Sequence, residues 1–121
     1  MASLVLSDFR RLVVKVGSSL LVDEHGELNR RWLQTLAHDL GALQQDGHEI
    51  LIVSSGAIAI GSSILGINKR RARLEELQAA AAAGQVQLVH AYQESLGAHG
   101  IRAAQVLLTP DDTENRRRFL N

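Results

Sequence analysis

Two short apolar segments rich in β-branched residues, 12–17 and 49–54, are separated by a helical pattern, and this alternation constrains the fold most strongly. Between them, apolar residues recur at helical spacing from Trp32 to Leu43, and Asn29 precedes the pattern as a helix N-cap. The second segment is apolar at successive positions, so we expect its strand to be covered on both faces. The two segments therefore predict parallel strands joined by a crossover helix.

The remaining residues continue the alternation. We expect a turn-rich loop at 18–28, a short helix at 57–60, and mostly loop at 61–73, where glycine and asparagine recur. A long helical pattern follows at 74–99, and its small residues between Ala79 and Gly84 would allow another backbone to approach closely.

The last part of the sequence predicts a third strand at 101–109 and then a further helix. Pro110 permits a helix start, and acidic residues follow it, which is favourable near a helix N-terminus. With no internal repeat or linker, residues 1–121 are expected to form one α/β domain with a mainly parallel sheet.

Composition excludes several classes of protein. Thirteen basic residues balance thirteen acidic ones, which argues against a nucleic-acid partner. The chain has no cysteine, so disulfides and thiolate metal sites are excluded. The N-terminus lacks the pattern of a signal peptide, and no apolar run approaches the roughly 18 residues of a membrane helix. We therefore expect a cytoplasmic protein that does not associate with membranes.

The first candidate site is the end of the first predicted strand, where Lys15, Gly17 and Ser18 lie close together in sequence. A lysine near the carboxyl end of a parallel strand can reach the crevice where α/β proteins bind ligands. Gly17 allows close approach of a phosphate, and Ser18 adds hydroxyl and amide donors. These residues predict a phosphate cradle, although an ordinary turn with a solvated lysine explains the pattern about equally well.

The second candidate site is the segment Ser54, Ser55, Gly56 and Ala57, between the second strand and a helix. Backbone amides at the start of a helix favour an anion, so a carboxylate or a phosphate could bind there. Simple helix capping by serine is the plainer explanation when this segment is taken alone.

Two other kinds of site are not supported. Residues 56–63 imitate a P-loop, but Ser62 stands where that motif requires lysine. The five histidines show no metal-ligand spacing, so no residue is assigned to a metal.

Six segments in order carry a specific resemblance: 12–19, Asn29-Arg30, 52–58, 83–85, 105–109 and 118–121. This series resembles the amino acid kinase family, from about Arg11 to the last residue, and within it the members that phosphorylate glutamate. The resemblance implies a three-layer α/β/α sandwich without a P-loop, of which this chain would be the N-terminal portion. It also implies ATP with Mg²⁺ as phosphoryl donor, L-glutamate as acceptor, glutamyl 5-phosphate as product, and a role in proline biosynthesis.

The resemblance assigns roles by position in the motifs. Lys15 matches a lysine that contacts ATP and steadies the transferring phosphoryl group, which makes it the candidate catalytic residue. Gly17 and Ser18 match backbone that surrounds the phosphates. Ser55 matches a glutamate-binding residue, with Gly56 and Ala57 in the same turn. Family members continue past Asn121 with further substrate-binding and nucleotide-binding residues, so we expect this chain alone to be inactive. The resemblance also implies that the full-length enzyme is a homo-oligomer.

Two alternatives remain open. The chain could belong to another amino acid kinase, one that acts on acetylglutamate or aspartate. It could also be a non-catalytic interaction module that binds a partner copy or a regulatory ligand. Either way, a sheet with missing neighbours would leave an unpaired edge and exposed apolar surface.

Overall fold

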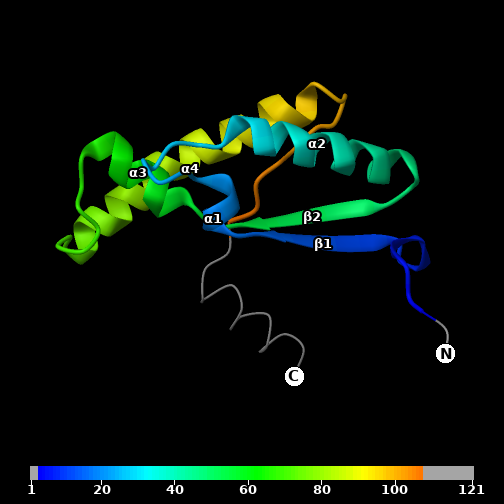
Figure 1. Ribbon diagram of the computed structural model, residues 1–121, viewed down its shortest axis with the longest axis horizontal. Coiled ribbons are helices and arrows are strands. Elements are labelled where there is room, and N and C mark those ends of the chain that lie inside the picture. Colours follow the sequence, from blue (N-terminus) through cyan, green and yellow to red (C-terminus); the bar gives the residue numbers. More distant parts are fainter. Residues whose placement is uncertain (1–2, 108–121) are drawn as a thin grey trace.

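The structure, a computed structural model, describes residues 3–107 as a two-stranded parallel sheet covered by helices. The elements in order are η1 (Leu6–Asp8), β1 (Arg11–Val16), α1 (Ser18–Leu21), α2 (Arg30–Gln45), β2 (Glu49–Ser54), α3 (Ala57–Leu65) and α4 (Leu74–Gly97). Figure 1 shows both strands running toward α1 and the start of α3. The mixed α/β architecture with parallel strands is confirmed.

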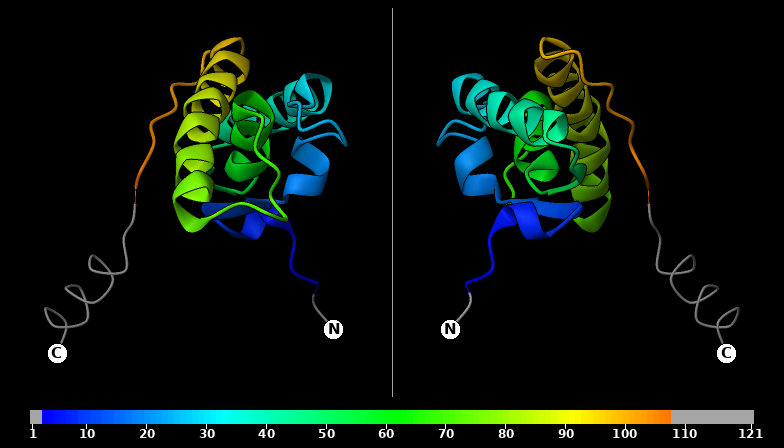
Figure 2. Two further views of the ribbon diagram at one scale, coloured as in Figure 1. Left: turned by 90° about the vertical axis from the view of Figure 1, so that its left-hand side faces the viewer. Right: turned by 90° about the vertical axis from the view of Figure 1, so that its right-hand side faces the viewer.

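Strand register brings alternate residues of β1 and β2 to the same face of the sheet. Leu12 pairs with Ile50 and Val14 with Ile52, and of these residues Val14, Ile50 and Ile52 pack against the core under the helices. Figure 2 shows the helices gathered on this one side of the sheet. The core is mainly aliphatic, and its largest fully buried side chains are Leu21, Leu33 and Leu88.

The opposite face of the sheet is uncovered by the described residues, so the expectation of a strand covered on both faces is wrong for β2. Val13, Leu51 and Val53 are 64%, 53% and 50% exposed on that face. The strands are apolar on both faces because their sequence suits a sheet between two helix layers, of which residues 3–107 supply one. The expected exposed apolar surface is therefore present.

The cap of α2 is confirmed. Asn29 accepts a hydrogen bond from the Trp32 amide through Oδ1 at 3.2 Å, and the apolar stripe of the helix buries Leu33, Ala37 and Leu40. We expect Asn29→Ala to lower the free energy of unfolding by about 1 kcal/mol, because one terminal amide loses its acceptor. Urea denaturation would measure this loss, and Asn29→Asp, which keeps an acceptor oxygen, should be nearly neutral. Equal losses in both variants would contradict the capping role.

The segment 18–28, expected to be a loop, begins with a short helix. Ser18–Leu21 forms α1, because burying Leu21 completely and Val22 to 8% exposure draws this segment into the core. The remaining turn at 23–27 is closed by an antiparallel bridge between Val22 and Leu28.

The helix expected at 57–60 continues as α3 to Leu65. Gly61 lies within the helix and does not end it. Glycine is needed there because α4 crosses so closely that a Cβ on Gly61 would collide with the backbone of Ala80. The helix ends at Gly66, whose φ of 67° suits glycine. The close approach expected at residues 79–84 is thus made by α3.

The third strand expected at 101–109 is absent from its described part, 101–107. Ile101 and Ala103 pack against the core, and the Ala103 carbonyl accepts a hydrogen bond from Gln93 of α4. A strand needs a hydrogen-bonded neighbour, and the sheet of the described residues contains only β1 and β2. The helix expected after Pro110, with Asp111, Asp112 and Glu114, lies outside the described residues.

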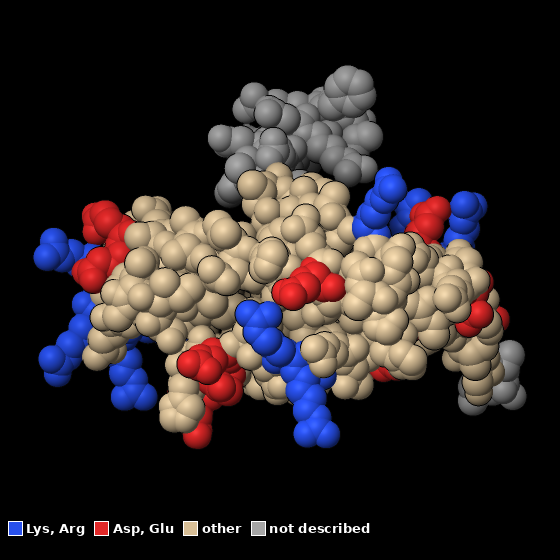
Figure 3. Space-filling model, turned by 90° about the horizontal axis from the view of Figure 1, so that it is seen from above, with Lys and Arg blue, Asp and Glu red and all other residues tan. Residues whose placement is uncertain are grey.

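Surface charge is dispersed on the helical side of the molecule. In Figure 3, basic and acidic side chains alternate around the face, with a broad uncharged area between them. In the part of the chain that the structure describes, no helix is long and apolar enough to span a membrane.

Candidate functional site

The two sequence-predicted turns meet at the carboxyl ends of β1 and β2. The Ser55 amide donates to the Val16 carbonyl at 3.0 Å, and the Ser55 hydroxyl donates to the same oxygen at 3.3 Å. Val16 is the last residue of β1 and immediately precedes Gly17. One carbonyl therefore joins the predicted phosphate segment to the predicted substrate segment.

Gly56 packs against α1 and the residue that follows it, Val22. A Cβ built on Gly56 would lie 3.1 Å from Val22 Cγ2 and 3.9 Å from Ser18 Cα. Its φ of 111° is also a conformation that side chains other than glycine rarely adopt. The backbone conformation therefore favours glycine at this position, and a side chain there would also press on Val22.

The turn at Ser55–Gly56 begins α3, a helix of nine residues. The hydrogen bonds among residues 3–107 include none donated by the backbone amides of Gly56, Ala57 or Ile58. Such amides carry partial positive charge at a helix N-terminus, which favours an anion. Ala57 is half-buried and Ser55 is exposed, so the turn is open to solvent on one side.

Gly17 and Ser18 lie at the neighbouring turn. Gly17 has extended backbone geometry, with φ of −79°, and a Cβ added there would meet no described atom within 4 Å. Ser18 is exposed and is the first residue of α1. There is therefore open space beside the backbone at Gly17.

Lys15 takes no part in these contacts between the two turns. It is exposed on the uncovered face of the sheet, opposite Val53 in the strand register. It lies two residues before Gly17, at the same end of the sheet as the turns. Its side chain therefore starts from the uncovered face of the sheet.

One residue that reaches the site, Tyr92, was not identified as part of it by the sequence reasoning. Tyr92 of α4 donates through its hydroxyl to Ser54 Oγ at 2.9 Å, and Ser54 Oγ donates to the Ser55 carbonyl at 3.1 Å. The helical period does place Tyr92 on the buried side of α4, and a buried tyrosine hydroxyl needs a partner. The sequence contains no signal that names Ser54 as that partner.

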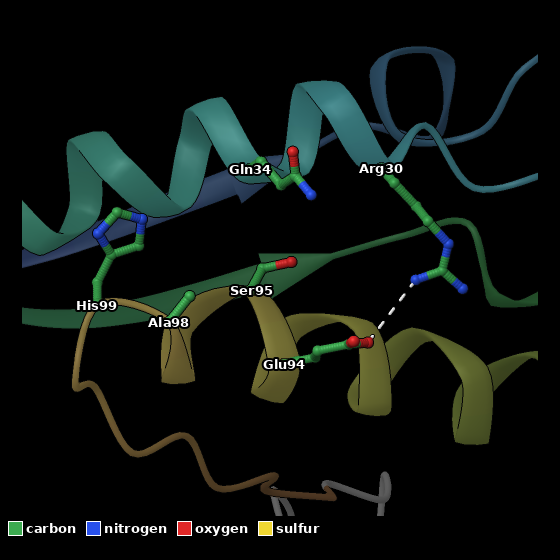
Figure 4. Close-up of a pocket in the computed structure, with 6 residues that line it drawn as sticks. All are labelled: Arg30, Gln34, Glu94, Ser95, Ala98 and His99. Atoms are coloured by element: carbon green, nitrogen blue, oxygen red, sulfur yellow. Dashed lines mark ion pairs between the residues drawn. The ribbon is translucent and has the colours of Figure 1, made fainter.

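A separate polar pocket lies between α2 and the C-terminal part of α4. Figure 4 shows its lining residues, with Arg30 and Glu94 forming an ion pair at 3.9 Å. Both side chains are largely exposed, so this pair contributes at most about 1 kcal/mol to stability. None of the sequence-predicted site residues lines the pocket, and we assign it no catalytic part.

Metal ligands are not concentrated anywhere in residues 3–107, where no group of three or more His, Asp or Glu side chains is placed to hold an ion. Mg²⁺ bound mainly through nucleotide phosphates needs few protein ligands. The two turns are compatible with a nucleotide that brings its own metal.

Comparison with known proteins places these turns in a family. The amino acid kinase family matches residues 10–121. Proteins named glutamate 5-kinase from Brucella abortus (strain S19), Brucella ovis and Brucella canis are each 57% identical over 116 residues, which is 96% of this chain. The chain spans 31% of the length of each of these relatives. It contains the strand–turn segments on which the resemblance rested, and it belongs to the amino acid kinase family.

Proposed function

We propose that this chain supplies the N-terminal part of the active site of an ATP-dependent glutamate 5-kinase. The reaction transfers the γ-phosphoryl group of ATP to the side-chain carboxylate of L-glutamate, giving ADP and L-glutamyl 5-phosphate, the first step of proline biosynthesis. The name shared by the Brucella relatives supports the substrate. The observation that carries the proposal is the double hydrogen bond from Ser55 to the Val16 carbonyl, which joins the two turns.

The phosphate side of the site is assigned to Lys15, Gly17 and Ser18. The Lys15 ammonium neutralises charge that develops on the transferring phosphoryl group, and Gly17 and Ser18 present backbone to the phosphates. Because the group being transferred is already highly charged, fixed positive charge and amide donors supply most of the catalysis.

The acceptor side is assigned to Ser55, Gly56 and Ala57. The Ser55 hydroxyl donates its proton to the Val16 carbonyl in a hydrogen bond. The lone pairs of the Ser55 hydroxyl can therefore accept a hydrogen bond from a substrate ammonium. The free amides at the start of α3 suit a substrate carboxylate. A glutamate carboxylate is already a nucleophile, so its oxygen attacks the γ-phosphorus and ADP leaves without a strong general base.

Mg²⁺, a cytoplasmic location and a homo-oligomeric full-length enzyme follow from the family resemblance and stay predictions. The uncovered apolar face of the sheet supports a larger assembly than residues 3–107, since contiguous apolar surface marks contact surfaces.

The test is a coupled ADP-release assay on the complete product of the gene that encodes this chain and, in parallel, on residues 1–121. Each is given ATP, Mg²⁺ and either glutamate, aspartate or acetylglutamate. We expect turnover with glutamate by the complete product and none by residues 1–121. Turnover with another acid alone would keep the fold and overturn the substrate. A folded complete product with no turnover on any of the three would favour a non-catalytic interaction module.

A further inference from the structure

The Tyr92 hydroxyl reaches the end of β2 from the buried side of α4. Tyr92 is only 8% exposed and belongs to the hydrophobic core. Its hydroxyl donates a hydrogen bond to Ser54 Oγ, and the Ser54 hydroxyl in turn donates a hydrogen bond to the Ser55 carbonyl. A chain of two hydrogen bonds therefore runs from the core to the turn assigned to the acceptor substrate.

The far end of this chain controls the direction of an amide. The Ser55–Gly56 peptide is trans, because the described chain has no cis peptide bond. In a planar trans peptide the Ser55 carbonyl and the Gly56 N–H point in opposite directions. Fixing the carbonyl toward Ser54 therefore aims the Gly56 N–H away from Ser54, together with the first amides of α3.

Ser55 is also held to β1, but the bonds that hold it do not fix the orientation of the Ser55–Gly56 peptide. The Ser55 amide and hydroxyl both bind Val16 of β1, but neither bond touches the Ser55 carbonyl. Gly56 has no side chain, and its φ of 111° is one that a flexible residue leaves easily. Among residues 3–107, the side-chain hydrogen bond to the Ser55 carbonyl comes from Ser54 Oγ, which itself accepts from the Tyr92 hydroxyl.

The Tyr92 hydroxyl must be protonated to donate the hydrogen bond to Ser54, and its pKa agrees with this. Burial raises the pKa of the Tyr92 phenol above its ordinary value, and the hydrogen bond with Ser54 lowers it in part. The hydroxyl is therefore protonated throughout the physiological pH range. A buried phenol also needs a hydrogen-bond partner for stability alone. A test must therefore separate this simpler explanation of the Tyr92–Ser54 bond from a role in substrate binding.

We propose that Tyr92 is a positioning residue for the acceptor substrate: through Ser54 it fixes the Ser55–Gly56 peptide so that the Gly56 amide faces a substrate carboxylate. This inference rests on the proposed function for the placement of the substrate at Ser55–Ala57. Tyr92 acts through Ser54 and touches no reacting atom.

The test is Tyr92→Phe in the complete gene product, which removes the hydroxyl and keeps the ring in the core. We expect the KM for glutamate to rise about tenfold, the value of one well-placed hydrogen bond, while the KM for ATP stays within about twofold. Ser54→Ala should raise the glutamate KM similarly, and the double variant should be no worse than either single one. Ser54→Thr, which keeps a hydroxyl, should retain most of the wild-type affinity.

Ser63→Ala is the matched control. Its hydroxyl also donates to a backbone carbonyl, that of His25 at 3.2 Å, but it is not linked to Ser55. Its glutamate KM should be unchanged. Equal rises in both KM values for Tyr92→Phe, or a loss of stability with an unchanged glutamate KM, would reduce Tyr92 to a structural role.

A second readout separates this inference from the proposed function. If the wild-type protein shows no turnover of glutamate, the proposed function fails, and the amide resonance of Gly56 still reports the peptide. We expect Tyr92→Phe and Ser54→Ala to shift that resonance and Ser63→Ala to leave it in place. An unshifted Gly56 resonance in Tyr92→Phe would overturn the positioning role whatever the substrate.

Discussion

Replacing Gly84 with alanine is expected to lower the free energy of unfolding by about 3 kcal/mol or more, the upper range for overpacking a core. Helices α3 and α4 touch through their backbones: a Cβ on Gly84 would collide with the Ala57 carbonyl and lie 2.8 Å from the Gly61 amide nitrogen. These are backbone atoms of a helix and cannot turn aside as a side chain would. The helices must separate, and α3 begins at Ala57, in the candidate site.

The measurement is urea denaturation of the complete gene product, read by circular dichroism. Gly97→Ala is the matched control, because Gly97 ends the same helix and a Cβ there would meet nothing within 4 Å. That variant should be neutral or more stable by up to about 1 kcal/mol, since alanine favours helix more than glycine does. Similar free energies of unfolding for the two variants would show that α3 and α4 are not in backbone contact.

Replacing Lys15 with methionine is expected to reduce kcat for glutamate phosphorylation about a hundredfold or more, the cost of removing one preorganised group from a transition state. Methionine keeps much of the length of the side chain and removes the charge. Lys15 is exposed, so the free energy of unfolding should change by no more than about 0.5 kcal/mol. Steady-state ADP release and urea denaturation on the same preparations separate the two effects.

Lys69→Met is the control for that variant. Lys69 is the other lysine of the sequence and is exposed in the turn between α3 and α4, away from the ends of β1 and β2. Its kcat should equal that of the wild type. A Lys15→Met enzyme with wild-type kcat would remove Lys15 from the phosphoryl-transfer step, whatever the family to which the chain belongs.

The elements that sequence predicted well are those whose cause is local. Asn29 caps α2 because its side chain reaches an amide three residues ahead, and this can be seen in the sequence. The meeting of the turns after β1 and β2 was not predicted, although it could have been, because parallel strands end at the same edge. Ser18 and Gly56 are close neighbours for this reason.

The elements that sequence predicted poorly depend on partners. Gly61 looks like a helix breaker until α4 is seen to require glycine there. Residues 101–107 have the apolar character of a strand but no hydrogen-bonded neighbour in the described sheet. In the same way, the periodicity of α4 places Tyr92 in the core, yet only the three-dimensional packing shows that it reaches Ser54.

Trapping the reaction product tests the central claim most directly, namely that the joined turns at Lys15–Ser18 and Ser55–Ala57 phosphorylate a carboxylate. Phosphorylation of a carboxylate gives an acyl phosphate, which hydroxylamine converts to a hydroxamate that can be measured by colour and mass. With ATP, Mg²⁺ and glutamate, the complete gene product should form glutamyl hydroxamate in step with ADP, and Lys15→Met should form almost none. ADP release without hydroxamate, or undiminished hydroxamate from Lys15→Met, would contradict the account.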